Sequence, residues 1–408
     1  MRVPRVHLPQ VLSLAALLCG VSCGSPGGGA SRQPLTYVPP RTPAVGLKSP
    51  VQAQPQPVRP PSPPIATPPS ALPRTNPPAV AVPAPPKTLT PSTTVPVPQP
   101  PVFTPVPPDP KARPATQPPN GSWLSFESWA VANGLGRPQR HATSTNVFHL
   151  RTGAGTVVLT AGSQLATLGG MKFYLGFAPQ LARGQLQIHT LDAQKNLMPL
   201  LSTHALPPRG NRVVVIDPGH GGDNTGAKSV HNGRLEKEYA LDWARRLKPL
   251  LEQRGWKVHL TRNSDTPLGL SERVALASNL NPSLFISLHF NASGSSQSGL
   301  ETYCLTPAGM PSNLTRDFKD DPLDVQPGNA WDRQNLQYAA RLHRSLIQNA
   351  GLTDRGVRHA RFMTVLRGQR SPAVLIEGGY LTNPAEARLI ADPAHRQKLA
   401  LAVARALE

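Results

Sequence analysis

The sequence predicts an α/β domain over residues 211–408, with a mostly parallel twisted sheet and helices on both faces, preceded by a small α+β or mainly β domain. Short apolar runs that suit buried strands alternate with helical stripes in this part of the chain. Such alternation is typical of a sheet that helices cover on both sides. The region before it differs in composition, because 31 of the chain's 50 prolines lie in residues 34–119.

Residues 1–23 have the pattern of a secretory signal peptide. Basic residues precede an apolar run at residues 11–19, and small residues follow that run. Cys23 follows a Val-Ser pair, which resembles the end of a bacterial lipoprotein signal. We therefore expect export to the periplasm or cell envelope, and both ordinary cleavage and a lipid anchor at Cys23 stay open.

Residues 24–120 are predicted to be a disordered, proline-rich tether. Proline runs favour the extended polyproline II conformation, and the segment is too poor in large apolar residues to form a core. The formal net charge of +20 at pH 7 favours an anionic partner, such as an acidic polymer of the cell envelope. No motif of RNA- or DNA-binding proteins is present, so nucleic acid is not an expected partner. Three cysteines exclude a disulfide scaffold, and we expect a monomer.

Residues 121–205 are predicted to form a small domain of short strands that opens with a helix. The strands are expected at residues 147–151, 156–160, 172–175 and 185–189, and the helix at residues 127–133. This pattern resembles the stalk domain that is similar to the N-terminal module of copper amine oxidases. That domain ends in a Pro-Leu sequence, as residues 199–201 do here. The resemblance implies a spacer without chemistry of its own.

The elements of residues 211–408 are predicted from their hydrophobic periodicity. Strand 213–216 is a continuous apolar run, and the helix after it has an apolar stripe from Tyr239 to Leu251 and ends before Gly255. Further strands are expected at residues 256–260, 284–288, 300–305, 362–366 and 373–376. Further helices are expected at residues 270–280, 335–350, 385–391 and 394–406.

Polar side chains follow three of the predicted strands, where functional residues collect in open α/β sheets. They are His220, His289 and Glu377. Glu236 lies at the start of the first helix and is a better candidate than Glu238, which points to a different face. Two histidines and a carboxylate suit a catalytic Zn²⁺ with water at its fourth position. A further carboxylate would then serve as the base and later as the acid.

Four segments resemble, in order, the motifs of the zinc-dependent N-acetylmuramoyl-L-alanine amidases, which degrade bacterial cell walls. They are residues 216–222, 236–241, 285–292 and 372–383. The resemblance implies that His220, Glu236 and His289 bind Zn²⁺ and that Glu377 is catalytic. It further implies that the substrate is peptidoglycan and that the amide between N-acetylmuramic acid and the L-alanine of the stem peptide is hydrolysed.

Other positions bear on the substrate pocket of such an enzyme. Asn291 and Arg355 match family positions and are expected to contact the substrate. Phe290 stands where the family usually has alanine, and residues 224–225 replace a common Asp-Pro pair; both departures concern the expected rim of the pocket. The long connection at residues 306–334 is expected to be a surface loop that shapes the substrate groove. Two alternatives stay open, a catalytically inactive wall-binding protein and a zinc hydrolase of another amide.

Overall fold

The computed structural model describes residues 122–202, 211–316 and 318–408. All of them belong to one compact unit, Pro101–Glu408. The expected signal peptide and tether, residues 1–120, lie outside the described residues. Among the helices described, none has the length and apolar character needed to cross a lipid bilayer.

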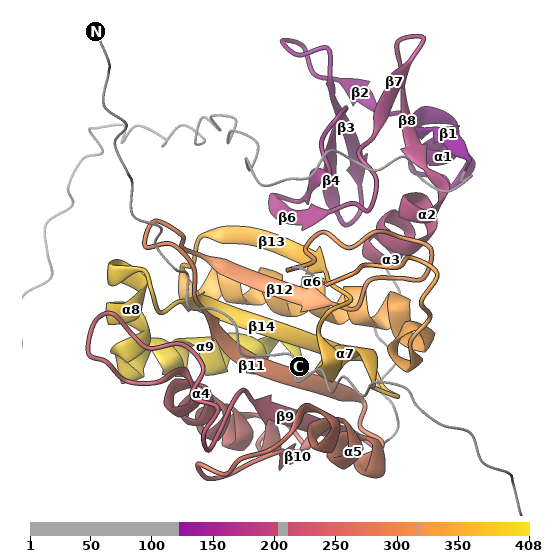
Figure 1. Cartoon of the computed structure of the whole chain (residues 1–408). Coiled ribbons are helices and arrows are strands. Elements are labelled where there is room, and N and C mark those ends of the chain that lie inside the picture. Colours follow the sequence, from indigo (N-terminus) through magenta and orange to yellow (C-terminus); the bar gives the residue numbers. More distant parts are fainter. Residues whose placement is uncertain (1–121, 203–210, 317) are drawn as a thin grey trace, which may run out of the picture. The chain divides into compact units, whose positions relative to one another are not determined.

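Residues 122–202 form antiparallel strands followed by short helices (Figure 1). Strands β2 to β6 pair with their neighbours in chain order, and β8 pairs with both β1 and β7. The strands are β1 (Trp123–Ser125), β2 (Gln139–Arg140), β3 (Val147–Thr152), β4 (Gly155–Thr160), β5 (Leu165–Leu168), β6 (Met171–Tyr174), β7 (Gln180–Ala182) and β8 (Gln185–His189). The helices are α1 (Phe126–Ala132), α2 (Thr190–Asp192), the π-helix η1 (Ala193–Leu197) and α3 (Met198–Leu201).

The four strands and the opening helix expected in this region are present, each within one residue of its predicted bounds. The strands that the sequence did not predict are β1, β2, β5 and β7, which are two to four residues long. Runs this short show too little alternation to predict a strand, and their antiparallel partners define them.

Residues 211–408 form an α/β domain around a large sheet with the strand order β10-β9-β11-β14-β12-β13. The first four strands are parallel neighbours, whereas β12 runs antiparallel to β14. The strands are β9 (Val213–Pro218), β10 (Lys257–Leu260), β11 (Leu284–Asn291), β12 (Leu300–Cys304), β13 (Asp354–His359) and β14 (Ala373–Tyr380). The predicted fold class is therefore confirmed as a mixed, largely parallel sheet, in which β12 and β13 run opposite to the other four strands.

Helices cover both faces of this sheet (Figure 1). They are α4 (Glu236–Glu252), α5 (Leu270–Leu280), the 3₁₀-helix η2 (Pro327–Trp331), α6 (Asp332–Ala350), α7 (Thr364–Arg367), α8 (Pro384–Ala391) and α9 (Pro393–Ala406). Helices α4, α6 and α9 pack together on one face, and α5 and α7 lie on the other. Strand residues alternate between the two: Val214 and Ile216 join the first core, and Val215 joins the second.

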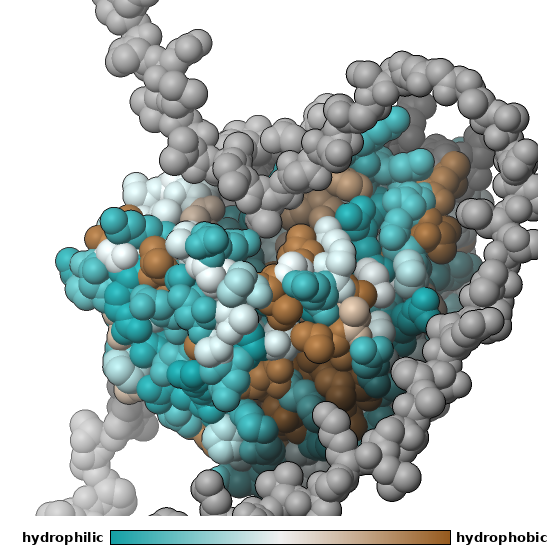
Figure 2. All heavy atoms as spheres, turned by 60° about the horizontal axis from the view of Figure 1, so that its bottom comes forward, coloured by the Kyte–Doolittle hydropathy of each residue, from teal (hydrophilic) through white to brown (hydrophobic). Residues whose placement is uncertain are grey.

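The second face is covered by the short helices α5 and α7 and by connecting segments that include Leu314 and Met363. Leu270 and Leu276 of α5 remain partly exposed. Figure 2 shows a mostly hydrophilic surface on which hydrophobic residues gather in a central band. Exposed apolar residues of this kind are common on soluble domains, and by themselves they indicate no partner.

The prediction of a strand at residues 362–366 is wrong, because Thr364–Arg367 forms helix α7. The strand that precedes this helix is β13, Asp354–His359. The segment is apolar because Val365 and Leu366 are buried in the second core. Burial alone does not distinguish a short helix from a strand. The sequence does not predict β13, since its Arg355 and Arg358 look like surface residues and are neutralised only by the distant Glu301.

The small domain continues the large sheet at its β13 edge. Phe173 of β6 pairs with Val357 in a parallel bridge. The Lys172 N–H donates to Asp354 Oδ2 at 2.8 Å, and the guanidinium carbon of Arg358 lies 4.1 Å from the centre of the Tyr174 ring. An uncovered edge strand is a site for unwanted pairing, and these contacts cover it.

Asp192 is a fully buried carboxylate that ties the helical end of the small domain to the loop after β6. Its Oδ1 accepts hydrogen bonds from the Gly176 N–H and from Asn196 Nδ2, both at 2.7 Å, and its Oδ2 accepts one from the Phe177 N–H at 2.9 Å. Burial raises the pKa of Asp192 to about 6, although the three donors oppose the change.

We expect Asp192→Ala to lower the free energy of unfolding by about 2–4 kcal/mol, because three buried donors lose their acceptor. The matched control is Glu127→Ala, which removes an exposed ion pair with Arg137 and should cost less than about 1 kcal/mol. The measurement is urea denaturation followed by tryptophan fluorescence. Similar small losses in both variants would show that the Asp192 contacts do not stabilise the fold.

Asp192 also predicts how stability depends on pH. Its pKa in the folded chain, about 6, lies above the ordinary value of 3.8, so the folded chain holds this proton more tightly than the unfolded chain. The contribution of Asp192 to stability should therefore fall as pH rises from about 4 to about 6. Denaturation of the wild type and of Asp192→Ala across this range checks the difference. The prediction fails if both proteins lose stability equally as pH rises.

Candidate active site

Three neighbouring parallel strands bring the predicted residues to one edge of the sheet. His220 follows β9, His289 lies near the end of β11, and Glu377 lies in β14 directly beside His289 in the strand register. Glu236 is the first residue of α4. The carboxyl ends of parallel strands meet at the same edge, which is why residues 157 positions apart become neighbours.

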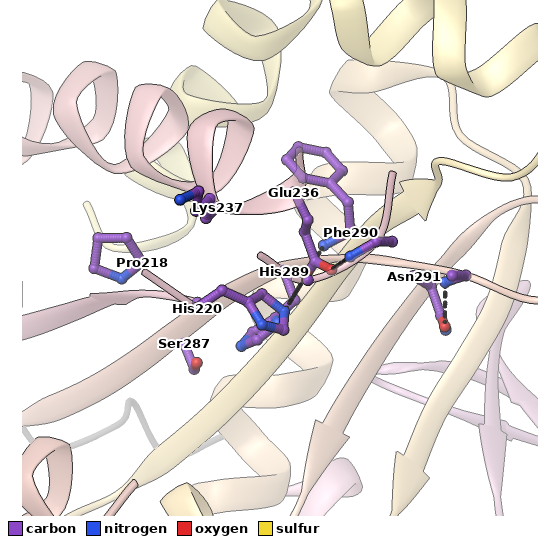
Figure 3. Close-up of polar contacts among 12 residues, drawn as sticks. Pro218, His220, Glu236, Lys237, Ser287, His289, Phe290 and Asn291 are labelled. Atoms are coloured by element: carbon purple, nitrogen blue, oxygen red, sulfur yellow. Dashed lines mark hydrogen bonds and ion pairs between the residues drawn. The ribbon is translucent and has the colours of Figure 1, made fainter. Parts of the chain in front are cut away.

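The side chains of His220, Glu236 and His289 converge on one point (Figure 3). His220 Nε2 and His289 Nδ1 each lie 2.9 Å from Glu236 Oε1. One ligand atom from each residue lies within 4.8 Å of the others. Donors around a tetrahedral zinc ion with bonds of about 2.1 Å are separated by about 3.4 Å, so small shifts would accommodate the ion.

The electrostatics of the three residues fit a cation. Burial raises the pKa of Glu236, but the neighbouring His220 and His289 outweigh burial and hold the pKa well below its usual range. Among the described residues, Glu236 contacts no lysine or arginine side chain. A buried carboxylate needs a positive partner, and two imidazoles with a carboxylate are a donor set that zinc prefers.

Backbone donors orient the carboxylate of Glu236. The Ala227 N–H donates to Oε2 at 2.9 Å, and the Phe290 N–H donates to Oε1 at 3.2 Å. His220 Nδ1 lies 2.7 Å from Asn224 Oδ1, which leaves Nε2 turned toward Glu236. The Asn224 that departs from the family motif therefore supports a candidate ligand.

Two glycines allow the side chains to approach closely. A Cβ on Gly219 would lie 2.2 Å from a ring carbon of His289. A Cβ on Gly226, whose φ is +65°, would lie 2.6 Å from Glu236 Oε2. Any other residue at these two positions would displace a candidate ligand.

Buried arginines hold the turn that carries His220, whose own φ is +61°. Arg273 of α5 donates to Asp217 Oδ1 at 2.6 Å, to the Pro218 carbonyl at 2.8 Å and to the His220 carbonyl at 2.6 Å. Arg262 donates to the Pro218 and Gly219 carbonyls at 3.0 and 2.6 Å. The sequence did not identify Arg273, because it lies on α5, far along the chain from the turn.

Glu377 is 7% exposed, and its Oε2 has no hydrogen-bond partner among the described residues. Burial raises the pKa of Glu377 to about 8; the charge of Glu236 adds to this effect and the charge of Arg316 opposes it. A carboxyl group whose pKa lies near neutrality is able to accept and return a proton, which suits general acid–base catalysis.

Asn291 and Arg355, the expected substrate contacts, both bind Glu301 of β12. Asn291 Nδ2 donates to Glu301 Oε2 at 2.9 Å, and Arg355 Nε donates to Oε1 at 3.0 Å. Glu301 is itself buried and lies opposite Glu377 in the β12–β14 register. Glu301 is not among the residues expected from the sequence, although a glutamate inside a predicted strand is a usable signal.

Comparisons with known proteins agree with this geometry. Residues 214–408 match the family described as N-acetylmuramoyl-L-alanine amidase. The N-acetylmuramoyl-L-alanine amidase LytC of Bacillus subtilis is 31% identical over 275 residues, which are 65% of this chain and 50% of LytC. The N-acetylmuramoyl-L-alanine amidase AmiA of Escherichia coli is 30% identical over 273 residues, which are 60% of this chain and 88% of AmiA.

Among solved structures, the catalytic domain of CwlV, an N-acetylmuramoyl-L-alanine amidase from Bacillus (Paenibacillus) polymyxa var. colistinus, is 33% identical. The match covers 48% of this chain and 95% of that domain, with a TM-score of 0.40. The chain spans about half the length of LytC but most of AmiA. The chain is 30% identical to AmiA and covers 88% of it, and residues 214–408 match the family. The chain therefore belongs to the N-acetylmuramoyl-L-alanine amidase family.

Proposed function

We propose that this protein is a zinc-dependent peptidoglycan hydrolase that cleaves the amide bond between N-acetylmuramic acid and the L-alanine of the stem peptide. The observation that carries the proposal is the convergence of His220, Glu236 and His289 beside the buried Glu377. Membership of the amidase family supplies the class of bond.

In this proposal His220, Glu236 and His289 hold the zinc ion. When bound, zinc polarises a carbonyl and lowers the pKa of its water to about 7. Glu377 accepts a proton from the attacking water as a bond forms between the water oxygen and the amide carbon. It then donates that proton to the L-alanine nitrogen as the carbon–nitrogen bond breaks. Arg273 and Arg262 hold the His220 turn in place during these steps.

The proposed setting is the cell envelope. A signal peptide at residues 1–23, with ordinary cleavage or a lipid anchor at Cys23, would export the chain to the compartment that holds peptidoglycan. The net charge of +20 favours binding to anionic envelope polymers. Residues 121–205 would serve as a spacer attached to the edge of the catalytic sheet.

The alternatives fare less well. A catalytically inactive wall-binding protein would have no need to keep all four residues of the site, and each of them is present. A zinc hydrolase of another amide would use the same site, so the bond cleaved must be measured directly.

Digestion of purified peptidoglycan followed by mass spectrometry should release peptides with a free N-terminal L-alanine. Cleavage between sugars, or between two amino acids of the peptide, would contradict the proposal.

His220→Ala and His289→Ala should each lose zinc as well as activity, because two remaining protein ligands hold the ion weakly. Elemental analysis of the purified variants measures the zinc content. His343→Ala is not a suitable control, since His343 is a buried structural residue that binds Asp354. His231→Ala is a better one, because His231 is exposed and should leave zinc content unchanged. Stoichiometric zinc in both ligand variants would refute the assignment.

Glu377→Gln should keep its zinc and lose activity by about 10²–10⁴-fold, the usual contribution of a general acid–base group. Glutamine has nearly the same size, so the strand geometry should persist. Zinc content and the hydrolysis rate of a soluble muropeptide are measured on the same preparation. Loss of zinc together with activity would mean that Glu377 is a ligand and that the division of roles is wrong.

Arg273→Lys should weaken zinc binding by about 10- to 100-fold, as changes to residues that orient metal ligands usually do. Lysine keeps the charge next to Asp217 but, with three N–H groups on one nitrogen, cannot donate to all four acceptors of Arg273. The control is Arg246→Lys on α4, which pairs with Asp242 away from the site. Competition with a zinc chelator measures the affinity, and equal affinities for the two variants would show that Arg273 does not orient the site.

A further inference from the structure

The connection between β12 and η2, residues 305–326, carries an arginine to the candidate active site. Arg316 Nη2 donates to Asn291 Oδ1 at 3.3 Å, and Asn291 lies two residues beyond His289 on β11. Asn291 Nδ2 in turn donates to Glu301, which lies opposite Glu377 in the β12–β14 register, so the contact places the guanidinium in the same neighbourhood as Glu377. Arg316 is therefore near both a candidate ligand and the candidate proton carrier.

The connection is anchored by buried contacts, so it holds Arg316 in a defined place. The Arg361 side chain is 0% exposed, forms an ion pair with Asp320 and donates to the Met310 carbonyl at 2.9 Å. The Asn313 N–H donates to the His359 carbonyl, and the His359 N–H donates back to Asn313 Oδ1, both at 2.9 Å. The expected surface loop is thus fixed on both sides of Arg316.

Arg316 itself has few contacts that stabilise the fold. Its side chain is exposed, its guanidinium lies over the Phe362 ring at 5.5 Å, and its φ is +44°. Among the described residues, no carboxylate forms an ion pair with it; its one hydrogen bond goes to a neutral amide. A left-handed backbone costs about 1 kcal/mol for such a residue.

A free cation beside the site suits an anionic group of the substrate. In the proposed substrate, the lactyl carboxyl of the sugar is consumed in the bond that is cleaved, and the remaining groups of N-acetylmuramic acid are neutral. Carboxylates near the scissile bond therefore lie on the peptide side. The nearest is the α-carboxylate of the second stem residue, a glutamate joined to the chain through its γ-carboxyl, which some cell walls carry as a carboxamide.

We propose that Arg316 binds this α-carboxylate and makes the enzyme prefer stem peptides in which it is free over those in which it is amidated. The inference rests on the proposed function and adds the class of peptide to it. Arg316 is the specificity residue, and Asn291, held by Glu301, fixes the position of its guanidinium. The competing role of Arg316 is an effect of its charge on Glu377, which would affect every substrate equally.

The test compares two substrates, N-acetylmuramoyl-L-alanyl-D-glutamate and its α-carboxamide, each with the γ-carboxyl closed as an amide as in the stem peptide, with the full chain loaded with zinc. Wild type should cleave the carboxylate with a kcat/KM about 10- to 100-fold higher, the range of a charge-assisted hydrogen bond. Arg316→Gln should have a lower kcat/KM for the substrate with the free carboxylate and an unchanged kcat/KM for the carboxamide, so that the preference is lost. The control is Lys319→Gln, which removes an exposed positive charge from the same connection and should keep the preference. Added salt should reduce the preference, because the contact is exposed.

Competition by the peptide products gives a readout apart from the chemical step. The γ-amide of L-alanyl-D-glutamate should inhibit wild type more strongly than the corresponding α-carboxamide does. The two peptides should inhibit Arg316→Gln equally. Equal loss of kcat on both substrates in Arg316→Gln, or no preference in wild type, would overturn the role of Arg316 and leave the amidase intact. Failure of zinc-loaded wild type to cleave either substrate would instead overturn the proposed function and this inference with it.

Discussion

The candidate active site depends on a buried carboxylate, that of Glu236, whose Oε1 both His220 and His289 contact at 2.9 Å. A carboxylate in this position is costly unless cations or donors surround it. Its surroundings meet that requirement: the start of α4 aims Glu236 at the strand ends, and backbone N–H groups from the loop before α4 and from β11 complete its hydrogen bonds. The glycines at positions 219 and 226 leave the space that the arrangement needs.

A second constraint comes from the direction of β12. This strand runs antiparallel to β14, and Glu301 lies opposite Glu377 in the register. The buried carboxylates of Glu301 and Glu377 are therefore neighbours. Arg355 and Arg358 neutralise Glu301, and Tyr303 and Tyr380 donate to it. In the part of the chain that the structure describes, Glu377 has no such partners at Oε2 and keeps a raised pKa, so the two carboxylates differ through their contacts.

One arginine of β13 also connects the large sheet to the small domain. Arg358 stacks on Tyr174 and pairs with Glu301, so one side chain joins the covered edge of the sheet to the neighbourhood of Glu377. The connection that carries Arg316 contacts β13 through Asn313 and His359. The edge strand therefore supports the small domain and the connection that carries Arg316 together.

The sequence by itself determined the fold class of residues 211–408, most of its elements and the four residues of the candidate site, because apolar periodicity and polar residues at strand ends are local properties. It did not determine β13, whose charged residues suit a strand only when Glu301 neutralises them, or the helix at Thr364–Arg367, whose apolar run fits either structure. Only the tertiary structure decided that Asn291 and Arg355 bind Glu301, that Arg273 holds the His220 turn, and that Arg316 reaches the site. Each of these contacts joins residues at least ten positions apart and follows from strand order and direction, which local periodicity does not specify.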